Sequence, residues 1–323
     1  MFEMVLDNKD GKLWDISGVV SDLSWKTSRI GKPSSCEFSI VLGDDRAEPE
    51  FQCHPGDIVR LKKEGTGLFY GYVFSIDRGQ ENILKILAYD QIRYLLTNET
   101  YVFTGMTASQ IIQKIAKASK LKVGTIADTE YPIPSMIEDN VKLLDMICKA
   151  LDHTLIAKLQ NYVFYDDFGS LTLQNIANMS LDFVIGDESL LYDYDFKRTI
   201  DSDTYNRIKI VQDNKQTGRR DVHIAQDSAN IAQWGRLQYF EKADENMNLA
   251  QIREKLNQML ILKNREQKTL KLDSIGDTRV RAGNFIPVSI KKLGINQYFL
   301  VDECSHQFNG RDHTMSLNVR VIA

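Results

Sequence analysis

One short motif in the chain could bind a catalytic metal ion. Asp167, Phe168 and Gly169 reproduce the DFG triplet with which protein kinases hold magnesium. A kinase also needs an HRD catalytic loop, a glycine-rich GxGxxG segment and a lysine in a VAIK strand, and the sequence contains none of them. Because these parts function only together, we interpret residues 167–169 as a turn at a strand end.

Two pairs of cysteine and histidine could contribute metal ligands. Cys53 adjoins His54, and one residue separates Cys304 from His306. Each segment supplies at most two soft ligands and lacks the CxxC or HxxxH spacing of a zinc site. A site would form only if the two segments met, so we predict no metal.

The acidic and nucleophilic side chains form no recognisable catalytic set. Adjacent acids occur at residues 44–45, 166–167 and 302–303, but neighbours on a strand point to opposite faces and cannot jointly flank a glycosidic bond. Ser305 and His306 also lie side by side, and no GxSxG elbow is present. The sequence predicts no catalytic residues, no cofactor and no enzymatic activity.

Composition excludes several classes of protein. The 323 residues are 43% hydrophobic, which argues against disorder and is enough for two or three domains with real cores. With 40 basic and 44 acidic residues the net charge is −4, so we expect no sequence-specific nucleic-acid binding. Basic segments at residues 218–220, 279–281 and 291–292 could touch phosphate, but solvated turns are the simpler interpretation.

The sequence also indicates where the chain is made. Residues 1–7 carry acids where a secretory signal needs Lys or Arg, and apolar runs such as residues 259–262 fall far short of the roughly 18 to 20 residues of a membrane helix. Cysteines at positions 36, 53, 148 and 304 lack the spacing of a disulfide scaffold. We expect a soluble protein with reduced thiols, made in a cytoplasm.

The first hundred residues have the alternation of antiparallel β-strands. Side chains alternate along residues 37–42 and 59–62, and turns at residues 65–67 and 81–82 precede strands at 68–76 and 83–88. This predicts a β-meander that could close into a small barrel.

An α+β unit is expected after the meander, from residue 98 to about 180. Thr107 and Gln110 have the spacing of a capping box, and an apolar stripe follows over residues 111–121. A second stripe, over residues 141–151, predicts another helix. We expect residues 154–158 and 162–166 to form a hairpin, and residues 167–169 to turn into a strand at 171–173.

A second β region follows from about residue 195. It is predicted to contain a polar turn at residues 213–218 and strands at residues 205–211, 221–225, 269–273, 284–290, 298–303 and 315–321. One helix interrupts it near residues 247–264, with a narrow apolar face from Leu249 to Leu260. That face could pack on its own domain, which is the default, or on a neighbouring chain.

The two β regions echo each other. Residues 54–61 match residues 281–288 in pattern, each with a Gly-Asx turn that begins an alternating strand. A glycine-containing loop follows in both, then an aromatic-rich strand, at residues 68–70 and 298–300, and a terminal strand. Two similar domains in one chain would explain the echo, but any two β-meanders share turn and strand signals, so coincidence stays open.

Several segments together resemble a known family. They are residues 206–211, the turn through Gly218-Arg219, residues 228–237 and residues 275–283, of which Gly276-Asp277 to Gly283 is the most specific. Similar segments occur at residues 55–57, 69–71, the Thr107 helix and the Leu143-Leu144 helix, so the resemblance covers nearly the whole chain. The chain resembles the baseplate hub protein of contractile phage tails, of prophage-derived tail particles and of contractile bacteriocins.

The resemblance implies a homotrimeric ring with two tail-tube-like barrels per chain. In that family the ring joins the sixfold tail tube to the threefold central spike and contacts the tape-measure protein and other baseplate subunits. It implies assembly in the cytoplasm of a bacterial host and a final place in the baseplate of a virion or particle. It brings no enzymatic residues, so any wall-degrading activity would belong to another subunit. The echo points independently to the same geometry, because three chains with two similar barrels each present six barrels.

The predicted fold class is α+β and mainly β. Two small antiparallel β-barrel domains, at residues 1–97 and 186–323, flank an α+β insert at residues 98–185. The predicted function is a structural baseplate hub. Two other classes stay open: a tail-associated enzyme that processes cell wall or carbohydrate, with Trp14, Trp25 and Trp234 in a sugar cleft, and a host-surface binding module.

Overall fold

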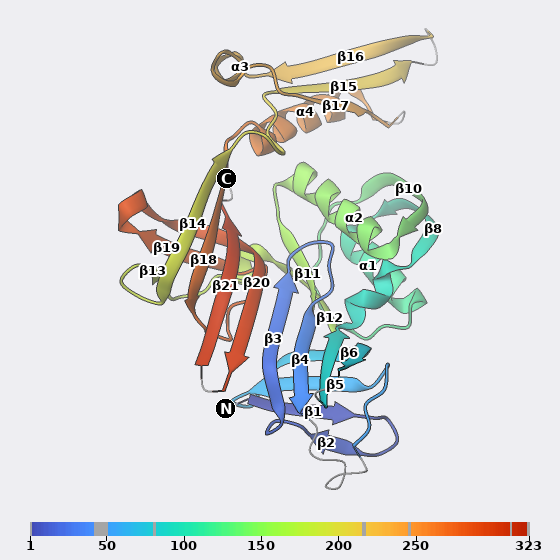
Figure 1. Cartoon of the computed structure of the whole chain (residues 1–323). Helices are drawn as coiled ribbons and strands as arrows, with labels where there is room; N and C mark the ends of the chain where they lie inside the picture. Colours follow the sequence, from blue (N-terminus) through green and yellow to red (C-terminus); the bar gives the residue numbers. More distant parts are fainter. Residues whose placement is uncertain are drawn as a thin grey trace.

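The protein is built mainly from strands, with helices in two attached units (Figure 1). The computed structural model describes residues 2–41, 51–79, 82–214, 218–244, 247–310 and 312–321. Among these residues one large, almost entirely antiparallel sheet runs through the molecule, and three small sheets lie outside it. The fold is therefore mainly β, as predicted.

The first β region is antiparallel, and its strands at residues 58–63, 66–78 and 83–89 form a meander, as predicted. The strand at residues 35–41 departs from that meander, because it pairs with the strand at 83–89 and not with the next one in the chain. Val59 and Leu61 are buried, and the alternating Arg60 and Lys62 are partly exposed, because strand side chains point to opposite faces. The elements are β1 (Phe2–Asp7), β2 (Leu13–Asp15), β3 (Val20–Ser28), β4 (Ser35–Val41), β5 (Ile58–Lys63), β6 (Thr66–Arg78), β7 (Ile83–Tyr89) and the 3-10 helix η1 (Gln91–Leu96). The predicted turn at residues 81–82 falls partly outside the described residues.

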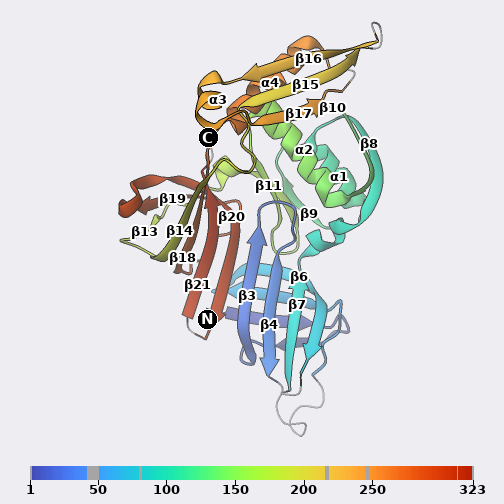
Figure 2. The same ribbon diagram turned by 45° about the horizontal axis from the view of Figure 1, so that its top comes forward.

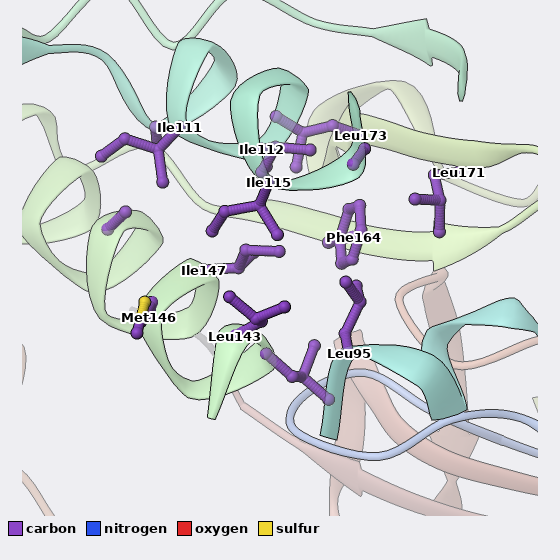
Figure 3. Close-up of a cluster of buried hydrophobic side chains, with 14 of the residues drawn as sticks. Leu95, Ile111, Ile112, Ile115, Leu143, Met146, Ile147, Phe164, Leu171 and Leu173 are labelled. Carbon is purple, nitrogen blue, oxygen red and sulfur yellow. The ribbon is translucent and has the colours of Figure 1, made fainter. Parts of the chain in front are cut away.

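The α+β insert has a core of its own. The predicted capping box is present: the Thr107 hydroxyl accepts a hydrogen bond from Gln110 N, and the Gln110 side chain accepts one from Thr107 N. Figure 3 shows Ile111, Ile115 and Ile147 of the two helices in one buried cluster with Phe164 and Leu173. The elements are β8 (Asn98–Met106), α1 (Ala108–Ala118), β9 (Val123–Ile126), β10 (Ile133–Lys142), α2 (Leu143–Lys158), β11 (Tyr162–Asp166), β12 (Leu171–Asn175) and η2 (Ile176–Asn178).

The hairpin predicted at residues 154–166 is wrong. Residues 154–158 are the last turn of α2, where the Thr154 hydroxyl donates to Ala150 O at 3.1 Å, and Leu159 ends the helix in the left-handed conformation with φ 55°. Strand β11 pairs instead with β12, so residues 167–170 form the turn. A five-residue apolar run has no period long enough to distinguish a strand from the end of a helix.

The second β region supplies the other half of the large sheet. Its strands are β13 (Ile185–Gly186), β14 (Leu191–Thr199), β18 (Gln267–Ile275), β19 (Phe285–Ile290), β20 (Ile295–Asn309) and β21 (Asp312–Arg320), with the 3-10 helix η3 (Lys291–Leu293). Leu272, Phe299 and Leu317 are buried in its core. Strand β14 was not among the predicted strands.

The insertion in this region is larger than the single predicted helix. A three-stranded sheet in the order β16-β15-β17 packs against the helix α4, as Figure 2 shows. Ile252, Leu256 and Met259 of α4 are buried there, while Leu249 is exposed. The elements are β15 (Arg207–Asn214), β16 (Arg219–Gln226), α3 (Ser228–Trp234), β17 (Gln238–Lys242) and α4 (Leu249–Lys263). Helix α4 also contacts α2, where Gln258 Nε2 donates to Ala157 O at 3.2 Å.

The large sheet joins both β regions edge to edge. Its strand order is β14-β18-β21-β20-β3-β4-β7-β6-β5-β1-β2, and β19 pairs with β20 beside this path. The sheet coils strongly, so that β1 and β5 run across the direction of β3 and β4 (Figure 1). In the described residues the two ends of neither half are hydrogen bonded to each other, so the predicted closed barrels are not confirmed.

Candidate assembly interface

The two β regions are a structural repeat. The first half has the strand order β3-β4-β7-β6-β5, and the second has the order β14-β18-β21-β20-β19. Every neighbouring pair within both series is antiparallel. This shared order supports the internal echo rather than coincidence.

The glycine turns of the two halves have the same hydrogen bonds. Gly56 has φ 94° and donates to Val73 O at 2.8 Å, and Gly283 has φ 97° and donates to Val301 O at 2.8 Å. In each turn the Asx side chain accepts from the backbone N three residues earlier, at 2.7 Å: Asp57 from His54 and Asn284 from Arg281. An Asx residue and a glycine at positive φ are what this turn requires.

A β-bulge also recurs at the equivalent place. The pairing of β6 with β7 shifts between Val73 and Ser75, and that of β20 with β21 shifts between Val301 and Glu303. The registers of β5 with β6 and of β19 with β20 place Val73 at the position equivalent to Val301. The predicted match of residues 68–70 with residues 298–300 is therefore wrong by two residues. The echo is correct in pattern, but its aromatic strand is out of register.

The junction between the repeats is a strand ladder. The second half of β20 pairs antiparallel with β3, with the partners Glu303 and Ser28, Cys304 and Thr27, Ser305 and Lys26, His306 and Trp25, Gln307 and Ser24, and Phe308 and Leu23. Side chains reinforce it: Gln307 Nε2 donates to Ser24 Oγ at 3.0 Å, and Ala282 N donates to Thr27 Oγ1 at 2.9 Å. The repeats therefore meet through a backbone ladder with a buried face.

A partly buried ion pair closes one end of this ladder. Arg29 Nε donates to Asp302 Oδ1 at 2.8 Å, and Arg29 N donates to Asp302 O at 2.9 Å. Arg320 pairs with the other carboxylate oxygen of Asp302. The Arg29 side chain is only 7% exposed, so it is shielded from solvent and salt.

A chain of neutral histidines lies beneath the junction. His306 stacks on Trp25 with ring centroids 4.9 Å apart, and His306 Nε2 lies 2.8 Å from Val280 O, which can only accept a hydrogen bond. His306 Nδ1 then accepts from His313 Nε2 at 2.9 Å, and His313 Nδ1 accepts from Lys63 Nζ at 3.0 Å. Burial lowers the pKa of His306 to about 4 and, together with the neighbouring His306, that of His313 to about 3.

The hairpin of β11 and β12 contacts both repeats. Phe168 in its turn lies 5.8 Å from Tyr70, centroid to centroid, and packs on Gly67, where a Cβ atom would lie 2.6 Å from the ring. On the other side the Arg281 guanidinium lies 3.8 Å from the centre of the Tyr165 ring. Residues 167–169, the DFG triplet, therefore form the predicted turn, and they dock the insert onto the first repeat.

Other candidate metal ligands are used structurally. Cys304 Sγ lies 3.2 Å from His306 Nε2, whereas His54 faces Asp57. Within the described ranges no group of three or more His, Cys, Asp or Glu side chains could hold a metal ion. Burial raises the pKa of all four cysteine thiols, to about 12 for Cys53 and about 11 for Cys148. They are therefore uncharged thiols.

The acid pairs are distributed over turns and ion pairs. Asp166 is buried and accepts from Gly169 N and the Gln91 side chain, and Asp302 binds two arginines. Asp90, also buried, accepts from Ser34 N and Ile92 N, and burial raises its pKa to about 7. Residues 44–45 lie outside the described residues.

The basic segments mostly pair with acids. Arg220 contacts Asp213 at 2.8 Å, Arg279 contacts Asp277 at 2.6 Å, and Lys291 contacts Glu188. The three tryptophans considered for a sugar cleft lie in different parts of the chain. Trp14 lies edge-on to Phe51, Trp25 stacks on His306, and Trp234 ends α3 in the β15–β17 unit. Among the residues that the structure describes, the contacts named here do not bring these groups together into a phosphate or sugar site.

One hollow lies between the insert and the β15–β17 unit. It has a volume of about 760 Å³ and is lined by ionisable side chains from α2, β17 and α4 together with apolar side chains such as Met136 and Ile156. These form ion pairs with each other or with neighbours, Lys255 with Glu241 at 2.5 Å and Lys149 with Glu138. His153 has a lowered pKa because it is buried. The hollow is therefore a mixed apolar and polar seam between two units of the chain, with ion pairs along it.

In the part of the chain that the structure describes, two strand edges of the large sheet are open, and neither was predicted. Strand β14 is the last strand of the large sheet, and its outer edge has no partner strand in the described residues. On β6, β5 pairs only as far as Tyr72, so residues 74–78 lack a partner on that side within the same residues. The alternation of Tyr192, Tyr194 and Phe196 with acids and Lys197 was a signal for β14.

No helix within the described residues combines the length and apolar character needed to cross a membrane.

The fold is that of phage tail proteins. The chain is similar to the 43 kDa tail protein of prophage MuSo2 from Shewanella oneidensis, with TM-score 0.72, 13% identity and 98% of both chains covered. It is similar to the tail protein from Neisseria meningitidis MC58, with TM-score 0.73, 12% identity and coverage of 99% of this chain and 96% of that one. It also resembles the Escherichia coli c3393 protein, a type VI secretion component described as similar to the T4 tail proteins gp27 and gp5, with TM-score 0.55, 10% identity and coverage of 94% and 74%.

The chain belongs to the YqbQ-like family, whose model matches residues 23–320. It is 32% identical to protein XkdQ of the phage-like element PBSX of Bacillus subtilis strain 168 over 308 residues, which cover 93% of this chain and 92% of that relative. It is 31% identical to protein YqbQ of the same strain over 306 residues, with the same coverage.

Proposed function

We propose that the chain is the structural hub of a contractile tail baseplate. Three copies form a ring that adapts the sixfold tail tube to the threefold central spike and contacts the tape-measure protein. The observation that carries this proposal is the repeat: the large sheet of one chain consists of two halves of the same strand order, joined edge to edge. Three such chains present six similar halves around a threefold axis.

The relatives support the proposal at a coarser level. XkdQ is a protein of a phage-like element, and two of the similar structures are tail proteins. The c3393 protein, described as similar to the T4 tail proteins gp27 and gp5, favours a tail role as well. We place the assembled chain in the tail baseplate, after assembly in the cytoplasm of the bacterial host.

A role without catalysis fits the same observations. In the described residues the ionisable groups named above act in turns, ion pairs and the histidine chain at the repeat junction. A zymogram of the purified chain on peptidoglycan tests this part. We expect no clearing, whereas clearing by this chain alone would favour the enzyme alternative.

Ring formation is the central test. Native mass spectrometry of the full-length chain over a wide concentration range should show trimers, and a density map of the tail tip should show six related sheets around one axis. Free chain can stay monomeric at low concentration because association follows mass action. A monomer in solution together with a tail tip that has no such ring would overturn the proposal.

A further inference from the structure

We infer that the ring closes by a strand ladder between copies, in which β6 of one copy pairs with β14 of the next. This inference rests on the proposed ring and assigns its interface. The ladder has the register that β20 and β3 have within the chain. The interface therefore repeats the junction that the chain already contains.

The repeat equivalence assigns the two edges. Because β6 and β20 share the turn and the bulge, residues 75–79 correspond to residues 303–307. Strand β4 pairs with β7 as β18 pairs with β21, so β4 corresponds to β18. Strand β3 pairs with β4 as β14 pairs with β18, and this places residues 24–28 in correspondence with residues 195–199. The pairing of residues 303–307 with 24–28 inside the chain thus has one counterpart between chains, residues 75–79 with 195–199.

Both edges are available for this pairing. In the second repeat, β20 pairs with β3 along one side. On the equivalent side of β6, no strand within the described residues pairs with residues 74–78, and none pairs with the outer edge of β14. Strand β14 has nine residues, and such a long open edge presents a row of unused backbone donors and acceptors. Pairing with another copy satisfies them by strand addition.

The register brings opposite charges together. Equivalence places Asp77 opposite Lys197, which corresponds to Ser305 opposite Lys26 at the internal junction. Asp77 and Lys197 are exposed, and within the described chain no ion pair involves either one. Directly opposite charges of unlike sign stabilise an antiparallel pair.

Two further positions fit the same register. Arg78 is placed opposite Phe196, at the position where the internal junction stacks the neutral His306 ring on Trp25. Here the guanidinium of Arg78 can cover the aromatic ring of Phe196 as a cation. At the internal junction Ala282 N donates to Thr27 Oγ1; the counterparts are Pro55, which has no N–H, and Arg198, which has no hydroxyl. Donor and acceptor are lost together, so neither is left unsatisfied.

A second copy is the occupant that these facts favour. A strand from a different tail protein could also add to either edge, but this chain itself carries both edges, and their registers are complementary. The same contact is heterologous, and it closes into a ring if the rotation at each junction equals that between the repeats of one chain.

Cysteine cross-linking tests the register. The full-length Asp77→Cys, Lys197→Cys double variant, treated with a short bis-maleimide, should give covalent dimers and trimers on a denaturing gel. The matched controls are the two single variants and the wild type, which carry the same four native cysteines, two of them buried. We expect no trimer from these controls.

Charge exchange tests the pair without cross-linking. Asp77→Lys or Lys197→Asp alone places like charges opposite each other, and each should raise the concentration for half-assembly about tenfold, since three junctions are affected per ring. The double variant Asp77→Lys, Lys197→Asp restores the attraction and should recover most of the assembly. Circular dichroism and thermal melting establish that the monomers remain folded.

The outcomes separate this interface from the proposed function. Cross-linked trimers with rescue by the double variant support the ladder. A trimer by native mass that neither cross-links nor responds to charge reversal overturns the ladder while the ring stands. A chain that forms no ring in solution or at the tail tip overturns the proposed function and the ladder with it.

Discussion

At the scale of single residues, substitutions at two equivalent glycines distinguish the cost of backbone strain from the cost of overpacking. Gly56 and Gly283 have nearly the same positive φ, but a Cβ on Gly283 would lie 2.8 Å from Val163, whereas nothing lies within 4 Å of one on Gly56. Gly56→Ala should therefore cost about 1 kcal/mol of unfolding free energy from strain alone. Gly283→Ala should cost about 2 to 4 kcal/mol, because overpacking is added.

Urea unfolding of the two variants beside the wild type measures this difference. Equal losses in both variants would mean that the hairpin of β11 and β12 does not pack on the Arg281–Asn284 turn in solution.

The histidine chain predicts a dependence on pH. An unfolded histidine has its ordinary pKa near 6.5, and the folded values of His306 and His313 are about 4 and about 3. The unfolded state thus binds more protons below pH 6.5, so this contribution to stability is present above pH 6.5 and is lost as the pH falls toward 4. The buried His306 should remove about 1 to 2 kcal/mol between pH 7 and pH 5, and the half-buried His313 should remove less because solvent screens its shift.

The variant His313→Gln isolates that contribution. Asp90 acts in the opposite direction, because its folded pKa of about 7 exceeds the unfolded value and its stabilisation is lost as the pH rises through 7. Comparing wild type and variant cancels Asp90. We expect a weaker loss of melting temperature between pH 7 and pH 5 in the variant, and parallel curves would contradict the neutral histidine chain.

At the scale of elements, the N-terminus of α1 depends on its capping box. Thr107→Ala removes the hydroxyl that accepts from Gln110 N and should lower the unfolding free energy by about 1 kcal/mol. Thr107→Ser keeps an acceptor in place and should cost less than half as much. Chemical denaturation of both variants gives the comparison, and equal losses would assign the effect to the lost methyl group.

Elements with local signals were predictable, and those defined by distant partners were not. The capping box, the DFG turn and the apolar face of α4 follow from a few neighbouring residues. Residues 154–158 were misassigned because five residues are too few to show a helical period, and Ile156 packs on the distant core of α4 and the β15–β17 sheet. Strand β14 was overlooked although its alternation is regular, and the small sheet of β15, β16 and β17 needs a parallel pairing across about thirty residues.

At the scale of the whole molecule, the junction between β20 and β3 should make both repeats unfold together. Arg29→Met removes a shielded partner of Asp302 and leaves a carboxylate held by Arg320 alone, so we expect a loss of about 2 kcal/mol. Lys26→Met is the control, because its ion pair with Glu37 is about half exposed and lies within one repeat; it should cost less than about 0.5 kcal/mol.

Calorimetry provides the readout for this pair of variants. The wild type should show one transition for the large sheet, and Arg29→Met should lower its temperature or split it. Two separate transitions in the wild type would mean that the ladder between the repeats adds little to cooperativity.

The repeat could be seen in the sequence, but the junction could not. Gly-Asx turns at residues 56–57 and 283–284 are local signals, and they correctly suggested two similar halves. The pairing of His306 with Trp25 joins residues from opposite ends of the chain, and no periodicity within either strand specifies it. Its edges became recognisable as an assembly surface only once the ladders of both repeats were compared.

Carrying both sheets on one polypeptide has a consequence for counting. Six separate sheets would need five association steps to make the proposed ring, each with its own loss of translational and rotational freedom, whereas three linked pairs need two. Because each chain carries two sheet halves, any number of whole chains contributes an even number of them to the ring. An error that adds or omits one chain changes the sheet count by two, a mismatch that a sixfold tube can reject more sharply than a change of one.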